Sequence, residues 1–194
     1  MTFDGDRWAH LGHKRGECYA DTDQGITYVH IPKNASSFIK GCLLGSQKFT
    51  YSLSLVKNNR YLVVLRDPID RWVSGMAEYE SNSKQTNIAY QQITFDDHTE
   101  TQWYFLDGVI LDQCDFIMIN DSFKDNLAHW FNEQGYITDI NNATKSNSSQ
   151  GTAKESLKSK YQAIVDTVPA FVLKLKKHFA DDYALINRVK FYGN

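Results

Sequence analysis

Two short segments of the chain combine cations, hydroxyls and small residues, a composition that suits an anion-binding site. The first consists of Pro32, Lys33, Asn34, Ala35, Ser36, Ser37 and Phe38. Small residues let the backbone turn tightly round an anion, while the lysine, two hydroxyls and the N–H groups of a following helix point toward it. The G-x-x-x-x-G-K-[ST] pattern is missing, which disfavours an ordinary ATPase or GTPase. The alternative interpretation is a proline–lysine turn capped by serines.

The second segment is RDPIDRWVS, residues 66–74. Arg66 stands where a strand should end, and its planar guanidinium suits bidentate contact with a phosphate. Ser74 follows the expected helix cap Asp67 by about two helical turns, so its hydroxyl returns to the face of the cap. Arg66 and Ser74 can therefore meet one anion. The alternative is an ion pair between Arg66 and Asp67 or Asp70, with Ser74 on the helix surface.

Both segments lie between an expected strand and an expected helix. Apolar runs predict strands at residues 26–31 (ITYVHI), 61–65 (YLVVL) and 114–120 (CDFIMIN). Helical spacing of apolar residues predicts helices within 38–46, after Asp67, and at 98–106, 122–135, 155–168 and 171–179. This alternation predicts an α/β fold with a central, mostly parallel sheet flanked by helices. Ligands in such sheets bind beyond the carboxyl ends of the strands, where both segments lie.

Length and composition indicate one domain spanning residues 1–194. The chain has 194 residues and a mass of 22.3 kDa, which is typical of a single core. Residues 1–25 are polar and without a period, so we expect an irregular N-terminal arm. Residues 141–153 hold a polar, low-complexity stretch and are expected to form a mobile loop.

Charge and cysteine usage exclude several classes of protein. The 21 lysines and arginines and 23 aspartates and glutamates give a net charge of -2, so no general attraction to nucleic acid or membrane is expected. The three cysteines are far apart and fit neither a disulfide framework nor a zinc site. With no apolar stretch of ~20 residues and no signal sequence at the start, we expect a cytoplasmic protein of bacterial or viral origin.

In order and spacing, PKNASSF and RDPIDRWVS resemble two motifs of the sulfotransferases that use 3′-phosphoadenosine 5′-phosphosulfate (PAPS). In that family a PKxGTT-like loop binds the 5′-phosphosulfate, and an RDPxxRxxS segment binds the 3′-phosphate through its Arg and Ser. Here Ala35 replaces the glycine, serines replace the threonines, and the second motif is intact. Downstream, FDDHTETQWYFL followed by CDFIMINDSFKDNL is similar to the carbohydrate-modifying, Golgi-type (family 2) branch.

The resemblance implies a P-loop-like nucleotide-binding sulfotransferase fold. It implies transfer of a sulfuryl group from PAPS to a hydroxyl of a carbohydrate or other small acceptor, without a metal. The residues implied in donor binding are Lys33, Asn34, Ala35, Ser36, Ser37, Phe38, Arg66 and Ser74. Lys33 would also be catalytic, because its charge would stabilise the departing phosphate.

The acceptor must lose its proton to a base. His98 matches the histidine of the branch pattern and titrates in the useful range, while Glu78 follows Ser74 by one turn on the same helix face. A histidine that caps a helix and a solvated glutamate are the alternatives. His30, Asp96 and Asp97 are further candidates for the base. Two other functions stay open, a non-catalytic PAPS- or nucleotide-binding module and a small-molecule kinase.

Overall fold

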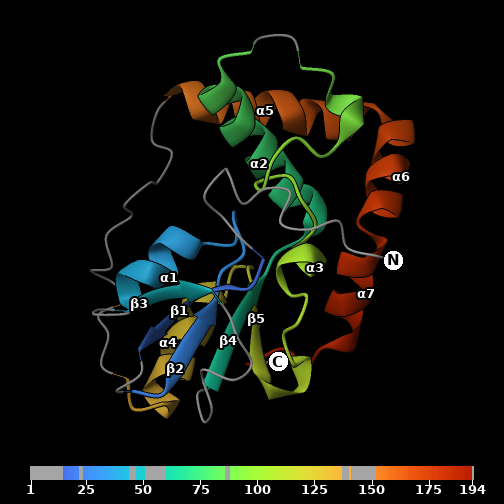
Figure 1. Ribbon diagram of the computed structural model, residues 1–194. Helices are drawn as coiled ribbons and strands as arrows, with labels where there is room; N and C mark the ends of the chain where they lie inside the picture. Colours follow the sequence, from blue (N-terminus) through green and yellow to red (C-terminus); the bar gives the residue numbers. More distant parts are fainter. Residues whose placement is uncertain are drawn as a thin grey trace.

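The computed structural model describes residues 15–21, 24–43, 47–50, 60–85, 88–136, 140 and 152–193 (Figure 1). Within these ranges the strands are β1 (Glu17–Asp21), β2 (Ile26–Val29), β3 (Gln47–Thr50), β4 (Arg60–Leu65) and β5 (Cys114–Met118). They form one sheet in the order β3-β1-β2-β4-β5. β2, β4 and β5 run parallel, whereas β1 is antiparallel to both β2 and β3. The α/β prediction is therefore confirmed, with a parallel centre and an antiparallel edge.

The parallel strands are buried on both faces, which explains their continuous apolar sequences. Leu62 and Val64 of β4 join the core formed with α1 (Ser36–Cys42) and α4 (Phe123–Glu133). Val63 and Leu65 point to the opposite face, toward α3 (Gln102–Phe105) and α7 (Ala180–Arg188). Side chains alternate between the two faces of a strand, so β4 supplies both cores.

A third apolar cluster joins α2 (Pro68–Ser83) to α5 (Thr152–Thr167) and α6 (Pro169–His178). Trp72 of α2 packs edge-on against Tyr161 of α5, with ring centroids 5.7 Å apart. Figure 1 shows α5 lying across α2, and α6 leading from it into α7. Two short 3-10 helices, η2 (Tyr90–Gln92) and η3 (Leu111–Gln113), lie in the connections between these elements.

The N-terminal arm was predicted to be irregular, and this is wrong for Glu17–Asp21, which forms β1. Cys18 and Ala20 are buried, and the register places Cys18 opposite Val29 and Asp21 opposite Ile26. Tyr19 between Cys18 and Ala20 packs against the core on the other face of the sheet, so apolar residues follow one another here without a visible period. Long-range pairing with β2, not local pattern, makes this segment a strand. Residues 1–14 lie outside the described residues.

Two further elements differ from their predictions. The helix predicted at 98–106 is shorter in the structure and consists of α3 alone. Thr99 Oγ1 accepts hydrogen bonds from the N–H groups of Phe95 and Asp96, so the residues before α3 form a turn instead of a helix. The last helix predicted from the sequence ends at residue 179, whereas the structure has a further helix, α7, after it. The predicted mobile loop at 141–153 lies outside the described residues up to 151, and its last two residues begin α5.

None of the helices in the described ranges has both the length and the apolar character needed to cross a membrane.

Candidate functional site

The loop that joins β2 to α1 turns through two residues with left-handed backbone angles. Lys33 has φ 68° and Ala35 has φ 55°, values in a region that residues other than glycine, asparagine and aspartate rarely adopt. Such strain persists only where the surroundings enforce it, and it clusters at functional sites. Ala35 is the N-cap of α1, and its side chain makes no capping hydrogen bond to the first turn, which contains Ser36, Ser37 and Phe38.

The buried side chains of Asn34 and Arg71 hold this loop conformation through hydrogen bonds. Asn34 Nδ2 donates to the Val64 carbonyl at 2.7 Å and to Gln102 Oε1 at 2.6 Å. Arg71 Nε donates to the Pro32 carbonyl at 2.9 Å. Asn34 is fully buried, so its side chain supports the β2–α1 loop from inside the protein.

The RDPIDRWVS segment, which follows β4, begins beside the β2–α1 loop. Gln102 joins them, because its Oε1 accepts from the Arg66 N–H at 3.0 Å and its Nε2 donates to the Arg66 carbonyl at 2.9 Å. Arg66 Nη1 lies 3.5 Å from the Lys33 carbonyl oxygen. Burial lowers the pKa of Arg66, and the charges of Asp67 and Asp70 oppose this. The structure therefore brings Lys33 and Arg66 to one edge of the sheet.

The sequence left open whether Arg66 pairs with Asp67. Asp67 Oδ1 instead accepts from the N–H groups of Ile69 and Asp70, at 2.9 Å and 3.1 Å, and caps α2 as predicted. Pro68 at the first helical position strengthens this start.

One face of α2 contacts the turn that carries His98. A Cβ added at Gly75 would lie 2.3 Å from the His98 carbonyl oxygen, so only glycine allows this approach. Ser74 is buried next to Gly75, and Glu78 lies one turn further on. The turn and the helix therefore place Glu78 near His98, whose charge helps to lower the pKa of Glu78.

Glu78 joins two lysines from distant parts of the chain. Its Oε2 accepts from Lys154 Nζ at 2.9 Å and from Lys33 Nζ at 3.4 Å. Burial raises the pKa of Glu78, but the Lys154 hydrogen bond and the Lys33 charge outweigh it and lower this pKa to about 2. Burial lowers the pKa of Lys33 more than the Glu78 charge raises it. A carboxylate with so low a pKa is a poor base, which favours a role for Glu78 in holding cations.

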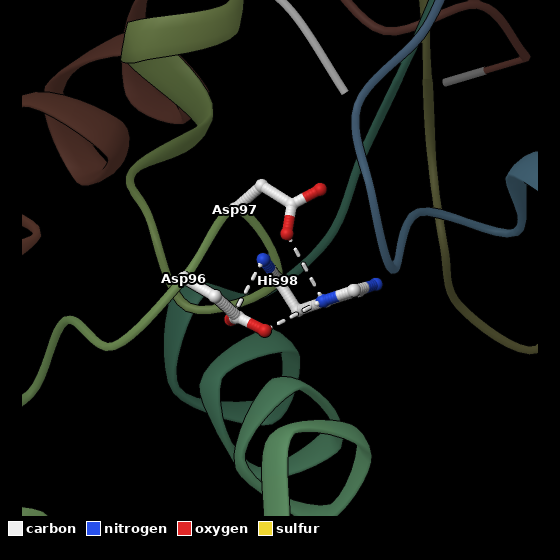
Figure 2. A group of neighbouring side chains, drawn as sticks. All are labelled: Asp96, Asp97 and His98. Carbon is white, nitrogen blue, oxygen red and sulfur yellow. Dashed lines mark hydrogen bonds and ion pairs between the residues drawn. The ribbon is translucent and has the colours of Figure 1, made fainter. Parts of the chain in front are cut away.

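Figure 2 shows His98 between two carboxylates. His98 Nδ1 lies 2.9 Å from Asp96 Oδ2 and 3.2 Å from Asp97 Oδ1. Burial lowers the pKa of His98, but the bonds and charges of Asp96 and Asp97 prevail and raise it to about 9. At neutral pH the ring is therefore an imidazolium, with its Nδ1 directed at the two carboxylates.

Among the described residues, the side chains that lie close enough together to bind a metal ion are those of Asp96, Asp97 and His98. Their ligand atoms lie within 4.8 Å of one another. A cation would require His98 Nδ1 to lose its proton, and the two carboxylates oppose that loss. The arrangement suits an oriented imidazolium better than a metal.

Two residues that organise the site were not predicted. Arg71 is fully buried, and its guanidinium bonds the carbonyls of Pro32 and Glu100. Gln102 is also fully buried, and α3 is held in turn by Asp182, which accepts from the N–H groups of Gln102 and Trp103. Arg71 lies within RDPIDRWVS and Gln102 within HTETQ, so their types were visible but their inward direction was not.

Comparisons of the chain with protein-family models, with curated proteins and with solved structures gave no significant match.

Proposed function

We propose that the protein is a PAPS-dependent sulfotransferase with a P-loop-like fold, which transfers a sulfuryl group to a hydroxyl of a carbohydrate or other small acceptor. One observation carries the proposal: Arg66 Nη1 lies 3.5 Å from the Lys33 carbonyl oxygen, so the two residues that carry the cations lie side by side at the carboxyl edge of neighbouring parallel strands. That edge is where α/β proteins bind nucleotides. PAPS has anionic groups at both ends of its ribose, which suits a site with two separate cations.

The residues present fit such a donor in chemistry. Lys33 and Arg66 supply charge, and the first turn of α1 adds N–H groups and the hydroxyls of Ser36 and Ser37. When bound, the donor supplies the sulfuryl group: the acceptor oxygen forms a bond to sulfur, and the bond from sulfur to the bridging phosphate oxygen breaks. Lys33 then stabilises the negative charge on the phosphate.

His98 is the base that takes the proton of the acceptor hydroxyl, at Nε2. Asp96 and Asp97 hold Nδ1 and stabilise the imidazolium that results. Because the pKa of His98 is raised to about 9, the neutral form that can accept a proton is a minor species at pH 7. Turnover should therefore rise with pH, reach half its maximum near pH 9 and level off above it.

A second function is favoured by the same raised pKa. An imidazolium at neutral pH adds a fixed cation to the site, which suits a non-catalytic nucleotide-binding module. Both functions predict binding of adenosine 3′,5′-bisphosphate, and only the sulfotransferase predicts transfer of labelled sulfate from PAPS to an acceptor. Calorimetry with ATP and magnesium in place of the bisphosphate tests the kinase alternative.

Calorimetry with adenosine 3′,5′-bisphosphate tests the binding site directly. Lys33→Ala and Arg66→Ala should each weaken binding roughly 10-fold or more, since charge-assisted hydrogen bonds contribute about 1.5–3 kcal/mol. Arg60→Ala is the matched control, because Arg60 begins β4 at the opposite end and pairs with Asp115 at 2.9 Å. No binding by the wild-type protein, or equal losses in all three variants, would refute the proposal.

A further inference from the structure

The Glu78 carboxylate bridges two elements that the proposed function does not connect. Its Oε2 accepts from Lys154 of α5 at 2.9 Å and from Lys33 at 3.4 Å. Lys33 belongs to the β2–α1 loop, which is the anion-binding loop of the proposed function. All three side chains are mostly buried, with exposed fractions of 22% for Lys33 and Glu78 and 32% for Lys154. One oxygen atom therefore serves two ammonium groups at unequal distances.

We propose that Glu78 and Lys154 are positioning residues for Lys33, with the Glu78 carboxylate bridging both ammonium groups and coupling α5 to the anion-binding loop. This inference rests on the proposed function, because it assigns the loop a donor that Lys33 must reach. Lys154 makes the shorter of the two bonds and is, in this proposal, the partner that Glu78 keeps. Lys33 can then turn from Glu78 to an incoming anion without leaving a half-buried carboxylate unpaired, a state that proteins avoid.

Lys154 holds a fixed position because α5 is fastened to α2 along the same face. Tyr161 follows Lys154 by about two helical turns, so both side chains point to α2. The Tyr161 hydroxyl donates to Glu80, and Lys160 Nζ lies 2.8 Å from the same carboxylate. These contacts, with the packing of Tyr161 on Trp72, hold the bridge in place.

The charges around Lys33 come from two elements. Glu78 attracts its ammonium from α2, while Lys154 and Lys158 repel it from α5. Lys158 lies one turn beyond Lys154, but its Nζ bonds Glu155 Oε1 at 2.9 Å. It therefore has the same charge near Lys33 without the bond to Glu78, which makes Lys158→Met the matched control for Lys154→Met.

The first experiment measures the titration of Lys33 without any ligand. Lysines are dimethylated with ¹³C, and the Lys33 signal is assigned by its loss in Lys33→Met. The pKa of Lys33 should fall in Glu78→Gln, rise in Lys154→Met and change less in Lys158→Met. Identical titration of Lys33 in the wild type, Glu78→Gln and Lys154→Met would overturn the proposal, and thermal unfolding checks that each variant is folded.

The second experiment measures function in the same variants. Glu78→Gln removes a competitor for Lys33, so adenosine 3′,5′-bisphosphate should bind about 5-fold more tightly. Lys154→Met should weaken binding about 5-fold, since Glu78 then holds Lys33 more strongly. Equal effects of Lys154→Met and Lys158→Met would reduce the role of Lys154 to general charge and overturn its positioning role.

The two experiments distinguish the proposed sulfotransferase function from the proposed Glu78 bridge. Shifts in the Lys33 titration without any binding of adenosine 3′,5′-bisphosphate would refute the proposed function and still support the bridge. Normal binding and transfer with no difference between Glu78→Gln and the wild type would refute the bridge and leave the proposed function in place.

Discussion

Replacing Gly75 with alanine should destabilise the protein, although alanine is the better helix former. Gly75 lies inside α2, where alanine is favoured over glycine by about 1 kcal/mol. Against this gain, the new Cβ would lie 2.3 Å from the His98 carbonyl oxygen and 2.8 Å from its carbon. Helix propensity and packing therefore predict opposite signs for one substitution.

The geometry decides which effect prevails. The 2.3 Å contact is about 1 Å shorter than an ordinary van der Waals contact, and the opposing atoms belong to the backbone, so a rotamer change cannot relieve it. Overpacking of this kind costs typically about 1–3 kcal/mol. With the helix gain subtracted from the upper part of that range, we expect a net loss of about 1–2 kcal/mol. For a chain of this size that corresponds to a fall in Tm of roughly 2–8 °C.

Urea and thermal unfolding of Gly75→Ala measure this loss, with Ser81→Ala as the control. Ser81 is an exposed residue of the same helix, where the substitution should change stability by less than about 0.5 kcal/mol. Displacement of the turn should also lower transfer activity more than donor binding, because His98 moves with it. If Gly75→Ala were as stable as the wild type or more stable, the close contact between α2 and the His98 turn would be disproved.

Three further predictions concern other parts of the site. His98 has a folded pKa of about 9 against 6.5 for the free side chain, so it stabilises the protein fully below pH 6.5 and loses this contribution as the pH rises to 9. Urea unfolding of His98→Gln should therefore show its largest loss, at most about 3 kcal/mol, near pH 6 and little loss above pH 9. Arg71→Met removes the bond to the Pro32 carbonyl and a fully buried charge, and should cost about 3–5 kcal/mol in urea unfolding, whereas a loss below 1 kcal/mol would contradict the structural role of Arg71. Ala35→Gly relieves a φ of 55° and should raise stability by about 0.5–1 kcal/mol, with Ala35→Val lowering it; the reverse order in thermal unfolding would show that the loop is not strained.

Much of the fold follows from local sequence pattern. YLVVL is a continuous apolar run and forms the β4 segment from Tyr61 to Leu65, all of it buried. Asp67 followed by Pro68 marks the start of α2, because the cap needs only a carboxylate within reach of two N–H groups. The helix predicted at 122–135 is α4, and Gly135 just after it has φ 68°, the left-handed conformation that glycine commonly supplies at a helix end. These features depend on neighbours within one or two turns of the chain.

β1 and the short α3 could not be predicted in this way. β1 is a strand because β2 offers it a register, and its own five residues are too few to show a strand period. α3 is short because Thr99 binds the backbone before it, and a pattern of apolar positions cannot show that competition.

By itself, the sequence determined the types of the chemical groups and the two loops that carry Lys33 and Arg66, since strand, loop and helix are written in consecutive residues. Only the tertiary structure decided which groups meet. Asn34 and Gln102 are 68 positions apart, and Glu78 and Lys154 are 76 apart, so neither pair follows from any local spacing. Their meeting depends on how the sheet and α5 bury their apolar faces, and it is this packing that turns Asn34 inward and Glu78 toward two lysines.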